Sequence, residues 1–494
     1  MRLKTKLLGI ETGGPLIVVL NPKTAAELDI MPSDRARIMA ENEYCVVIVN
    51  ISHRIGENEI GIYEEVQKQL DLSDGQPVTI IPEERPASIA QIKKKLDGLE
   101  LSRDEFFELV ADITDNRLTH TEISAFVSAI YTKGLSLEET EYLTRAMAES
   151  GQILNLGVKP VLDIHSIGGV PGNRITMVIV PILAAAGLYI PKTSSRAITD
   201  PSGTADTMEV LAPVALDLKE VKKVVLEHYG CIVWGGALDL APADDKIIEV
   251  EHPLQIDPPS MLLASILAKK CATGVTNMAL EIPFGPGTKC TKLRASELEK
   301  KFLNLGARLG IKIKPIKIDG SQPVGFRIGP ALECIDVLKV LENAPDAPKD
   351  LKARSLFFAS ILLESSGKVK RGKSLALAKE ILESGRALEK FKEIVAAQGG
   401  NPNISSESIR IGKYDETIYA ERSGKVQAID NNSIKKLGRI LGAPHSKGAG
   451  LLLRAKVGDR IKEGEPLFTI YAESGRKLSD GIVFVEANNP YKII

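Results

Sequence analysis

The chain has 494 residues, of which 44% are hydrophobic and 26% are charged, and its formal net charge is -1. A chain of this length is too long for one hydrophobic core, so we expect several domains. The nearly neutral charge argues against a protein that is held on nucleic acid by bulk charge. Any anionic ligand must therefore be bound by local groups.

The cysteines and the apolar runs indicate the compartment. Five scattered cysteines, none of them in a CxxC pair, suit a reducing environment and give no support to a structural zinc site. The first residues are not followed by an apolar run long enough for a secretory signal. The most apolar run, residues 177–188, is too short to span a bilayer and contains Pro181. We expect a buried helix there and a cytoplasmic protein.

Residues 1–84 are typical of short β-strands separated by turns. A faint repeat relates Leu28-Asp29-Ile30 and the strand that follows it to Leu70-Asp71-Leu72 and its following strand. Two copies of a helix-turn-strand unit predict a small, pseudo-symmetric N-terminal β-barrel, similar to double-psi barrels.

The sequence turns helical after a linker near Pro86. Ser102 and Ser136 each stand three residues before a glutamate, which is the pattern of a capping box, and Gly134 has the place of a helix stop. We expect a helical domain over residues 86–160, completed by later helices near residues 213–270.

From residue 161 onward, strand-like and helical runs alternate, which favours an α/β layer with a mainly parallel sheet. We assign residues 161–410 to this α/β domain. Residues 416–494 return to strands, and the run 455–468 resembles the strand-turn-strand of biotinyl-like barrels without the Met-Lys-Met that would carry a prosthetic group. The sequence therefore predicts a multidomain α/β protein that ends in an α+β, barrel-sandwich-like domain with a structural role.

Two loops rich in glycine and hydroxyl residues follow strand-like runs of the α/β domain. The first covers residues 165–176 and the second residues 194–206. Glycines let backbone N–H groups approach an anion, hydroxyls add donors, and a following helix N-terminus favours negative charge. The competing interpretations are a plain strand-to-helix turn and a polar surface loop. The hydroxyls and the arginines Arg174 and Arg196 favour a site that grips two phosphate-like groups.

Three other features add candidate residues. Asp257 has the place of an N-cap residue with Pro258 at the first helical position, so helix capping explains it at least as well as catalysis does. Ser265 and Lys269 stand one turn apart on the helix that would follow. Residues 285–289 form a glycine-rich turn that could present Lys289 to an anion, although a lone lysine in a turn is usually only solvated.

The loops resemble the signatures of the thymidine and pyrimidine-nucleoside phosphorylase family. The resemblance rests on residues 163–172, 194–198 and 203–209, and residues 265–270 and 322–325 extend it. It covers residues 86 to 494. It implies the nucleoside phosphorylase type of fold for the helical and α/β domains, and an enzyme that breaks an N-glycosidic bond with inorganic phosphate as co-substrate and without a cofactor or metal.

The chain departs from the pyrimidine members of the family at several positions. Ile164 stands where they have lysine, Ser195 where they have glycine, and Pro201-Ser202 where they have Thr-Gly. The arginine that grips the pyrimidine in those enzymes has no match in residues 241–244. Together with the extra N-terminal barrel, these departures resemble the archaeal AMP phosphorylase branch. The reaction this implies is AMP plus phosphate to adenine and ribose 1,5-bisphosphate, with CMP and UMP as further substrates.

The resemblance also implies roles for single residues. Asp257 would be the proton donor, with His165 as the alternative acid. The substrate-binding residues would be Gly169, Ser194, Ser195, Arg196, Ala197, Ile198, Thr199, Asp200, Thr204, Ser265 and Lys289, with His165, Ser166 and Lys269 as further candidates. The barrel domains would serve a homo-oligomer, a dimer or larger, and no nucleic-acid or membrane partner is implied.

Three alternatives stay open at this stage. The first is a thymidine or pyrimidine-nucleoside phosphorylase. The second is an enzyme similar to anthranilate phosphoribosyltransferase, which would need a diphosphate-sugar donor and a metal. The third is a binding or assembly module that has lost catalysis.

Overall fold

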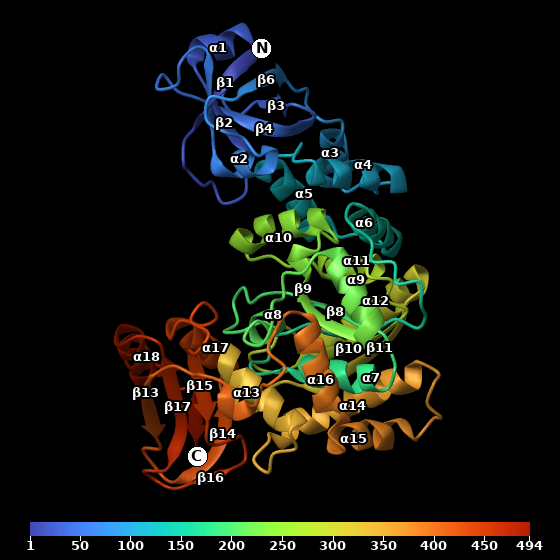
Figure 1. Ribbon diagram of the computed structural model, residues 1–494, viewed down its shortest axis with the longest axis vertical. Helices are drawn as coiled ribbons and strands as arrows, with labels where there is room; N and C mark the ends of the chain where they lie inside the picture. The colour runs from blue at the N-terminus through green and yellow to red at the C-terminus, as the bar shows by residue number, and fades with distance from the viewer. The chain divides into compact units, whose positions relative to one another are not determined.

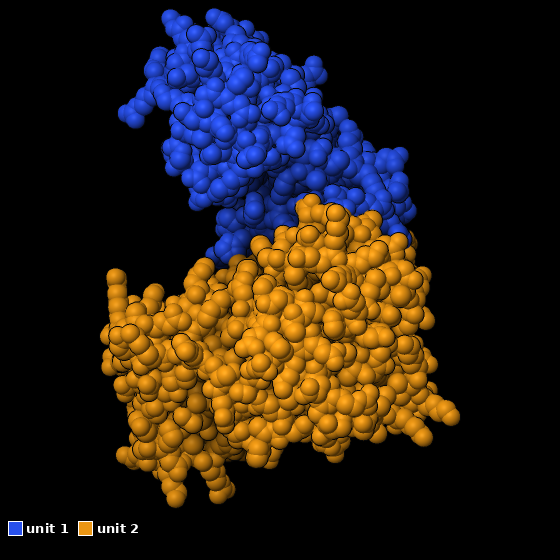
Figure 2. Space-filling view, viewed as in Figure 1, with its two compact units in different colours: residues 1–151, 241–268 blue, residues 152–240, 269–494 orange.

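A computed structural model describes residues 1–494, which divide into two compact units (Figure 2). Unit 1 consists of residues 1–151 and 241–268, and unit 2 of residues 152–240 and 269–494. Unit 1 contains a β-barrel and a helical bundle, whereas unit 2 contains a parallel sheet and a C-terminal domain (Figure 1). None of the helices has the length and apolar character needed to cross a membrane.

The N-terminal barrel is closed by six strands in the order β1-β5-β2-β4-β3-β6. Exchanging β1 with β4, β2 with β5 and β3 with β6 leaves every pairing unchanged, including the parallel pairs β1–β5 and β4–β2. The strands are β1 (Arg2–Leu7), β2 (Ile17–Leu20), β3 (Arg35–Ala40), β4 (Glu43–Ile51), β5 (Glu59–Ile62) and β6 (Pro77–Pro82).

The helices of the barrel follow the same exchange. Helix α1 (Pro22–Glu27) precedes β3, and α2 (Glu64–Leu70) precedes β6. Asp29 and Asp71, the matched residues of the sequence repeat, follow these helices with φ of 54° and 46°, so both take the left-handed conformation that aspartate tolerates. The predicted pseudo-symmetric barrel is therefore confirmed.

A helical bundle completes unit 1. The capping boxes expected at Ser102 and Ser136 are both formed, and Gly134 ends its helix with φ 74°. Helix α10 packs against α4 and α5, so later residues do join the bundle. The helices are α3 (Ser88–Leu96), α4 (Arg103–Thr114), α5 (His120–Lys133), α6 (Leu137–Glu149) and α10 (Pro242–Leu254).

One helix that we expected in the bundle, α9 (Leu218–His228), lies in unit 2 instead. We expected residues near 213–270 to complete the bundle, but only residues 241–268 belong to unit 1. Helix α9 is part of unit 2, because its buried residues Val221, Val224 and Val225 form an apolar stripe and the helix packs against strand β9 (Gly230–Trp234).

The core of unit 2 is a parallel sheet with the strand order β11-β10-β7-β8-β9. Strand β7 (Leu162–Ser166) pairs with β10 (Asn277–Phe284), which pairs with β11 (Lys312–Asp319). Strand β8 (Ile190–Ser194) pairs with β9, and the parallel bridge between Val161 and Tyr189 joins β7 to β8. Because every pairing is parallel, the carboxyl ends of β7, β8 and β10 lie at one edge.

Helices cover this sheet. Helix α7 (Ile175–Ala185) is apolar on all sides and almost wholly buried, as expected for the most apolar run of the sequence. It packs against α14 and α16. The other helices are α8 (Thr204–Met208), α11 (Pro259–Ala272), which crosses the division between the units, α12 (Lys292–Leu309), α13 (Pro330–Leu341), α14 (Lys349–Ser365), α15 (Ser374–Glu383) and α16 (Arg386–Ala397).

The C-terminal domain combines two small sheets with two helices. One sheet has the order β12-β15-β17-β13 and the other β16-β14-β18. Strand β12 (Arg327–Ile328) belongs in sequence to the α/β domain, before the C-terminal domain begins. The first sheet therefore contains strands from both domains. The remaining elements are β13 (Tyr414–Tyr419), β14 (Gly424–Ile429), α17 (Asn431–Ile440), β15 (Gly450–Leu453), β16 (Arg460–Ile461), β17 (Pro466–Ala472), α18 (Gly475–Ala487) and β18 (Tyr491–Ile493).

Candidate functional site

Three loops leave the carboxyl edge of the parallel sheet, after β7, β8 and β10. The connection from β7 leads to β8 on one side, and the connection from β10 leads to β11 on the other. Such a reversal of strand order is the topological switch point at which open α/β sheets bind their ligands. The loops singled out in the sequence therefore stand where the fold favours a site.

The loop after β7 touches the loop after β10. Gly168 and Gly169 have φ of 85° and 91°, a conformation that favours glycine. A Cβ atom on Gly169 would lie only 2.9 Å from the backbone nitrogen of Lys289. The exposed Lys289 side chain is therefore held beside the glycine pair, which brings two of the predicted binding residues together.

Four lysines surround His165 on β7. They are Lys192 of β8, Lys269 and Lys270 of α11, and Lys289. Burial and these ammonium groups hold the pKa of His165 well below its usual value of 6.5. The imidazole is therefore neutral at neutral pH.

Two of these lysines share one buried carboxylate. The Nζ atoms of Lys192 and Lys270 lie 3.3 Å and 2.5 Å from the carboxylate oxygens of Asp163, and all three side chains are at most 5% exposed. Burial lowers the pKa of Lys192 to about 8, although Asp163 opposes the shift. Two ammonium groups against one carboxylate leave a positive charge without a partner below the loops, and this favours an anion there.

The loop after β8 is closed by Asp206. Its carboxylate accepts the backbone N–H groups of Ala197, at 2.7 Å, and Gly203, at 2.8 Å. A Cβ on Gly203 would lie 2.6 Å from the carbonyl oxygen of Ser195, so the two ends of the loop approach closely only because residue 203 is glycine. The N–H group of Ala197 is thus already engaged inside the protein.

The outer side of the same loop is open. Ser195, Ile198 and Thr199 are exposed, and neither hydroxyl hydrogen-bonds to the protein. Ser194, Asp200 and Thr204 are half-buried around them. This part of the loop offers free donors and one apolar side chain to a ligand.

The two arginines of the loops are held by acids. Arg196 lies 2.8 Å and 2.5 Å from the two carboxylate oxygens of Glu209, and 3.4 Å from Asp206. Arg174 pairs with the buried Glu333 and donates to the carbonyl of Ser202. We expected both arginines to offer free guanidinium groups to phosphate. Their acidic partners were missed because nothing in the local sequence pairs them.

Asp257, in unit 1, precedes helix α11. The helix begins at Pro259, and the carbonyl of Pro258 accepts the N–H of Leu262. Pro258 therefore has the cap position and Pro259 the first helical position, each one residue later than the sequence indicates for Asp257 and Pro258. Either of the two consecutive prolines could occupy the first helical position, so the sequence alone does not determine at which residue the helix begins. The Asp257 carboxylate itself is exposed.

Other acids of unit 1 surround Ser265 and Asp257. The hydroxyl of Ser265 donates to the buried Asp244 at 2.8 Å. Burial and the nearby carboxylates of Asp257 and Asp244 raise the pKa of Glu251 to about 8. Of the predicted residues, Asp257 and Ser265 thus belong to unit 1, whereas the loops, His165, Ser166, Lys269 and Lys289 belong to unit 2.

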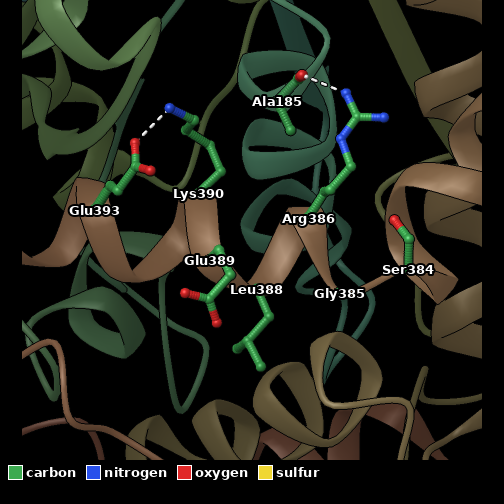
Figure 3. Close-up of a pocket in the computed structure, with 8 residues that line it drawn as sticks. All are labelled: Ala185, Ser384, Gly385, Arg386, Leu388, Glu389, Lys390 and Glu393. Atoms are coloured by element: carbon green, nitrogen blue, oxygen red, sulfur yellow. Dashed lines mark hydrogen bonds and ion pairs between the residues drawn. The ribbon is translucent and has the colours of Figure 1, made fainter.

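A cavity of about 400 Å³ lies between the end of α7 and the beginning of α16 (Figure 3). Its wall includes Ala185, the last residue of α7, which runs back from the carboxyl edge. Arg386 donates to the carbonyl of Ala185 at 3.1 Å, and Lys390 pairs with Glu393. None of the predicted site residues lines it. Nor does the structure contain a group of three or more His, Cys, Asp or Glu side chains arranged to hold a metal ion.

Three family models match the chain. The helical bundle domain of a glycosyl transferase family matches residues 90–151, and the a/b domain of the same family matches residues 158–267. The pyrimidine nucleoside phosphorylase C-terminal domain matches residues 425–492. The matches fall on the bundle, on the first loops of the sheet and on the C-terminal domain.

Curated relatives match over the full length. The AMP phosphorylase of Pyrococcus furiosus is 46% identical over 494 residues, covering 100% of this chain and 98% of the relative. That of Methanosarcina mazei is 44% identical, covering 99% of this chain and 96% of the relative. That of Thermococcus kodakarensis is 44% identical, covering 100% and 98%.

Two solved structures share the fold over 63% of this chain. Anthranilate phosphoribosyltransferase from Thermus thermophilus has a TM-score of 0.54 at 19% identity and is covered to 99%. The enzyme from Saccharomyces cerevisiae, in complex with PRPP and Mg, has a TM-score of 0.51 at 16% identity and is covered to 98%. At these identities the likeness shows the fold alone.

Substitution of Gly169 tests the contact between the loops. Gly169→Ala should weaken the binding of inorganic phosphate by about tenfold or more, because the new Cβ meets the backbone of Lys289 and must displace it. Gly168→Ala is the matched control, since it carries the same positive φ but its Cβ meets only the Lys289 side chain, at 3.9 Å. Calorimetric titration with phosphate measures both. Equal losses in the two variants would contradict the assignment.

Proposed function

We propose that this chain, which belongs to the AMP phosphorylase family, cleaves the N-glycosidic bond of AMP with inorganic phosphate. The proposal is carried by one observation: the loops after β7 and β10 meet above a buried cluster with excess positive charge. In that cluster two lysines, Lys192 and Lys270, share the single carboxylate of Asp163. An enzyme that joins phosphate to a phosphorylated sugar must hold two anions. Local positive charge and exposed donors meet that need in a chain that is neutral overall.

In this reaction an oxygen of inorganic phosphate attacks C1′ of the ribose. The bond from C1′ to the base nitrogen breaks, its electron pair stays with the base, and the sugar gains oxocarbenium character in between. Protonation of the base gives adenine, and the sugar leaves as ribose 1,5-bisphosphate. We propose that the two anions, the attacking phosphate and the 5′-phosphate of AMP, are bound by Gly169, His165, Ser166, Lys269 and Lys289.

The remaining binding roles follow the same proposal. Loop residues 194–200 and Thr204 would bind the nucleotide, together with Ser265. Free hydroxyls at Ser195 and Thr199 support this role, and the exposed Ile198 offers an apolar contact to a base. Arg196 would act by holding the loop in place, because its guanidinium group already pairs with Glu209.

We further propose Asp257 as the acid that protonates the leaving base. Two observations support it. The lowered pKa of His165 leaves that side chain neutral, which makes the alternative acid a poor proton donor at neutral pH. Asp257 is also free of the cap role that would have explained it without chemistry.

The substrate range and the assembly belong to the same proposal. CMP and UMP would be further substrates, no cofactor or metal would be needed, and the chain would work as a homo-oligomer in the cytoplasm. The barrel, whose exchange symmetry agrees with a double-psi type, would serve that assembly.

A substrate panel tests the proposed reaction. With phosphate present, AMP should release its base, whereas adenosine and thymidine should not, and EDTA should leave the rate unchanged. Base release can be followed by chromatography. Cleavage of thymidine would support a nucleoside phosphorylase instead. Activity with a diphosphate-sugar donor that EDTA abolishes would support a phosphoribosyltransferase, and no product from any nucleotide would indicate a binding module.

Replacement of the acid tests its role. Asp257→Asn should lower turnover by about a hundredfold or more while AMP affinity survives, because the amide keeps the size of the side chain but gives up the proton. Asp104→Asn, at a carboxylate 95% exposed in the helical bundle, is the control and should stay at the wild-type rate. Steady-state kinetics with AMP measures both variants. Full turnover in Asp257→Asn would exclude this residue as the acid.

A further inference from the structure

The ion pair that holds Arg196 extends into the C-terminal domain. Glu209, which binds both ends of the Arg196 guanidinium, also lies 2.6 Å from the Nζ of Lys447. The hydrogen bond from Arg196 has the largest effect on the pKa of Glu209, and Lys447 adds to it, so that the pKa is lowered to about 2. Lys447 stands between α17 and β15, far from the loop in sequence. One carboxylate thus joins the loop after β8 to the C-terminal domain.

Helix α17 contacts the same loop directly. A Cβ on Gly438 of α17 would lie 2.7 Å from Cγ of Pro201, so the proline ring rests on the helix where it has no side chain. Pro201 is one of the positions at which this chain departs from the pyrimidine enzymes. The departure therefore has a structural counterpart in Gly438.

The other end of α17 contacts the loop after β10. A Cβ on Gly287 would lie 2.7 Å from Cβ of Asn431, and Lys435 donates to the carbonyl of Gly287 at 3.2 Å. The amide of Asn431 donates to the carbonyl of Gly320 at 2.7 Å and is 1% exposed. A single helix of the C-terminal domain thus supports two of the three loops of the candidate site.

We propose that the C-terminal domain positions the loop after β8, residues 194–206, and that Lys447 is the positioning residue for it. The sequence alone predicts only a structural role for this domain. With Lys447 removed, Glu209 loses one of its two cations and can turn away from Arg196. The loop end that Asp206 and Arg196 hold then gains freedom, and the free hydroxyls of the loop lose their fixed positions.

The chain carries its own reporter of this linkage. Trp234 at the end of β9 is the single tryptophan, and the Arg196 guanidinium lies over its ring at 4.9 Å from the centroid. A change in the position of Arg196 changes the surroundings of the indole directly. Tryptophan fluorescence therefore reads the loop without any turnover.

The test compares Lys447→Met with two variants that should behave as wild type. Lys447→Arg keeps the cation, and Lys462→Met removes an exposed lysine of the same domain. We expect Lys447→Met to change the emission and the acrylamide quenching of Trp234, and to raise KM for AMP about tenfold while kcat changes little. A general loss of stability would lower the active fraction, and so kcat, without raising KM.

A second variant keeps the test decisive where Lys447→Met folds poorly. Gly438→Ala adds one methyl group against Pro201 and should raise KM for AMP in the same way. Unchanged KM and unchanged Trp234 fluorescence in both variants would overturn the proposal. The KM readout rests on the proposed function, but the fluorescence readout does not. A wild-type protein inactive on AMP would therefore refute the reaction while the linkage to Trp234 was still measured.

Discussion

Two buried ammonium groups share one carboxylate beneath the carboxyl edge of the parallel sheet, and the candidate site depends on this excess of positive charge. Lys192 and Lys270 both face Asp163, and no side chain of the three is more than 5% exposed. Burying an unpaired charge is costly, so an anion that comes close would stabilise this arrangement. The depressed pKa of Lys192, about 8, reflects that cost.

The surrounding loops make use of this charge. Gly169 and Lys289 meet at the switch point of the sheet, where the backbone can approach an anion, and His165 stays neutral because burial and the surrounding lysines lower its pKa. The loop after β8 adds free hydroxyls on its outer side. Its inner side is tied through Arg196 and Glu209 to the C-terminal domain, so the last segment of the chain takes part in shaping the site.

Sequence reasoning succeeded where the signal was local. The capping boxes at Ser102 and Ser136, the glycines of the two loops and the Leu-Asp repeat of the barrel are short patterns that a backbone conformation requires, and the structure contains each of them. The glycine-rich turn of residues 285–289 predicts Lys289 as a binding residue, and Lys289 lies against Gly169.

The failures concern partners that are distant in sequence. Asp163 and Lys192 stand in strands that look like ordinary buried runs. The ion pairs of Asp163 with Lys192 and Lys270 form only when β7, β8 and α11 are brought together. The arginines were expected to face a ligand because Glu209, Glu333 and Lys447 could not be assigned to them from spacing. The start of α11 was misplaced by one residue, since Pro258 and Pro259 suit it equally.

The pKa of His165 tests the central claim most directly. Imidazole resonances of labelled protein, with the His165 signal assigned by its loss in His165→Gln, can be followed by NMR as the pH is lowered. Burial and the surrounding positive charge lower the pKa of His165 and predict that it stays neutral well below pH 6.5, the usual value for the side chain. Titration of that signal near 6.5 would show that the lysine-rich cluster does not create the positive site described here.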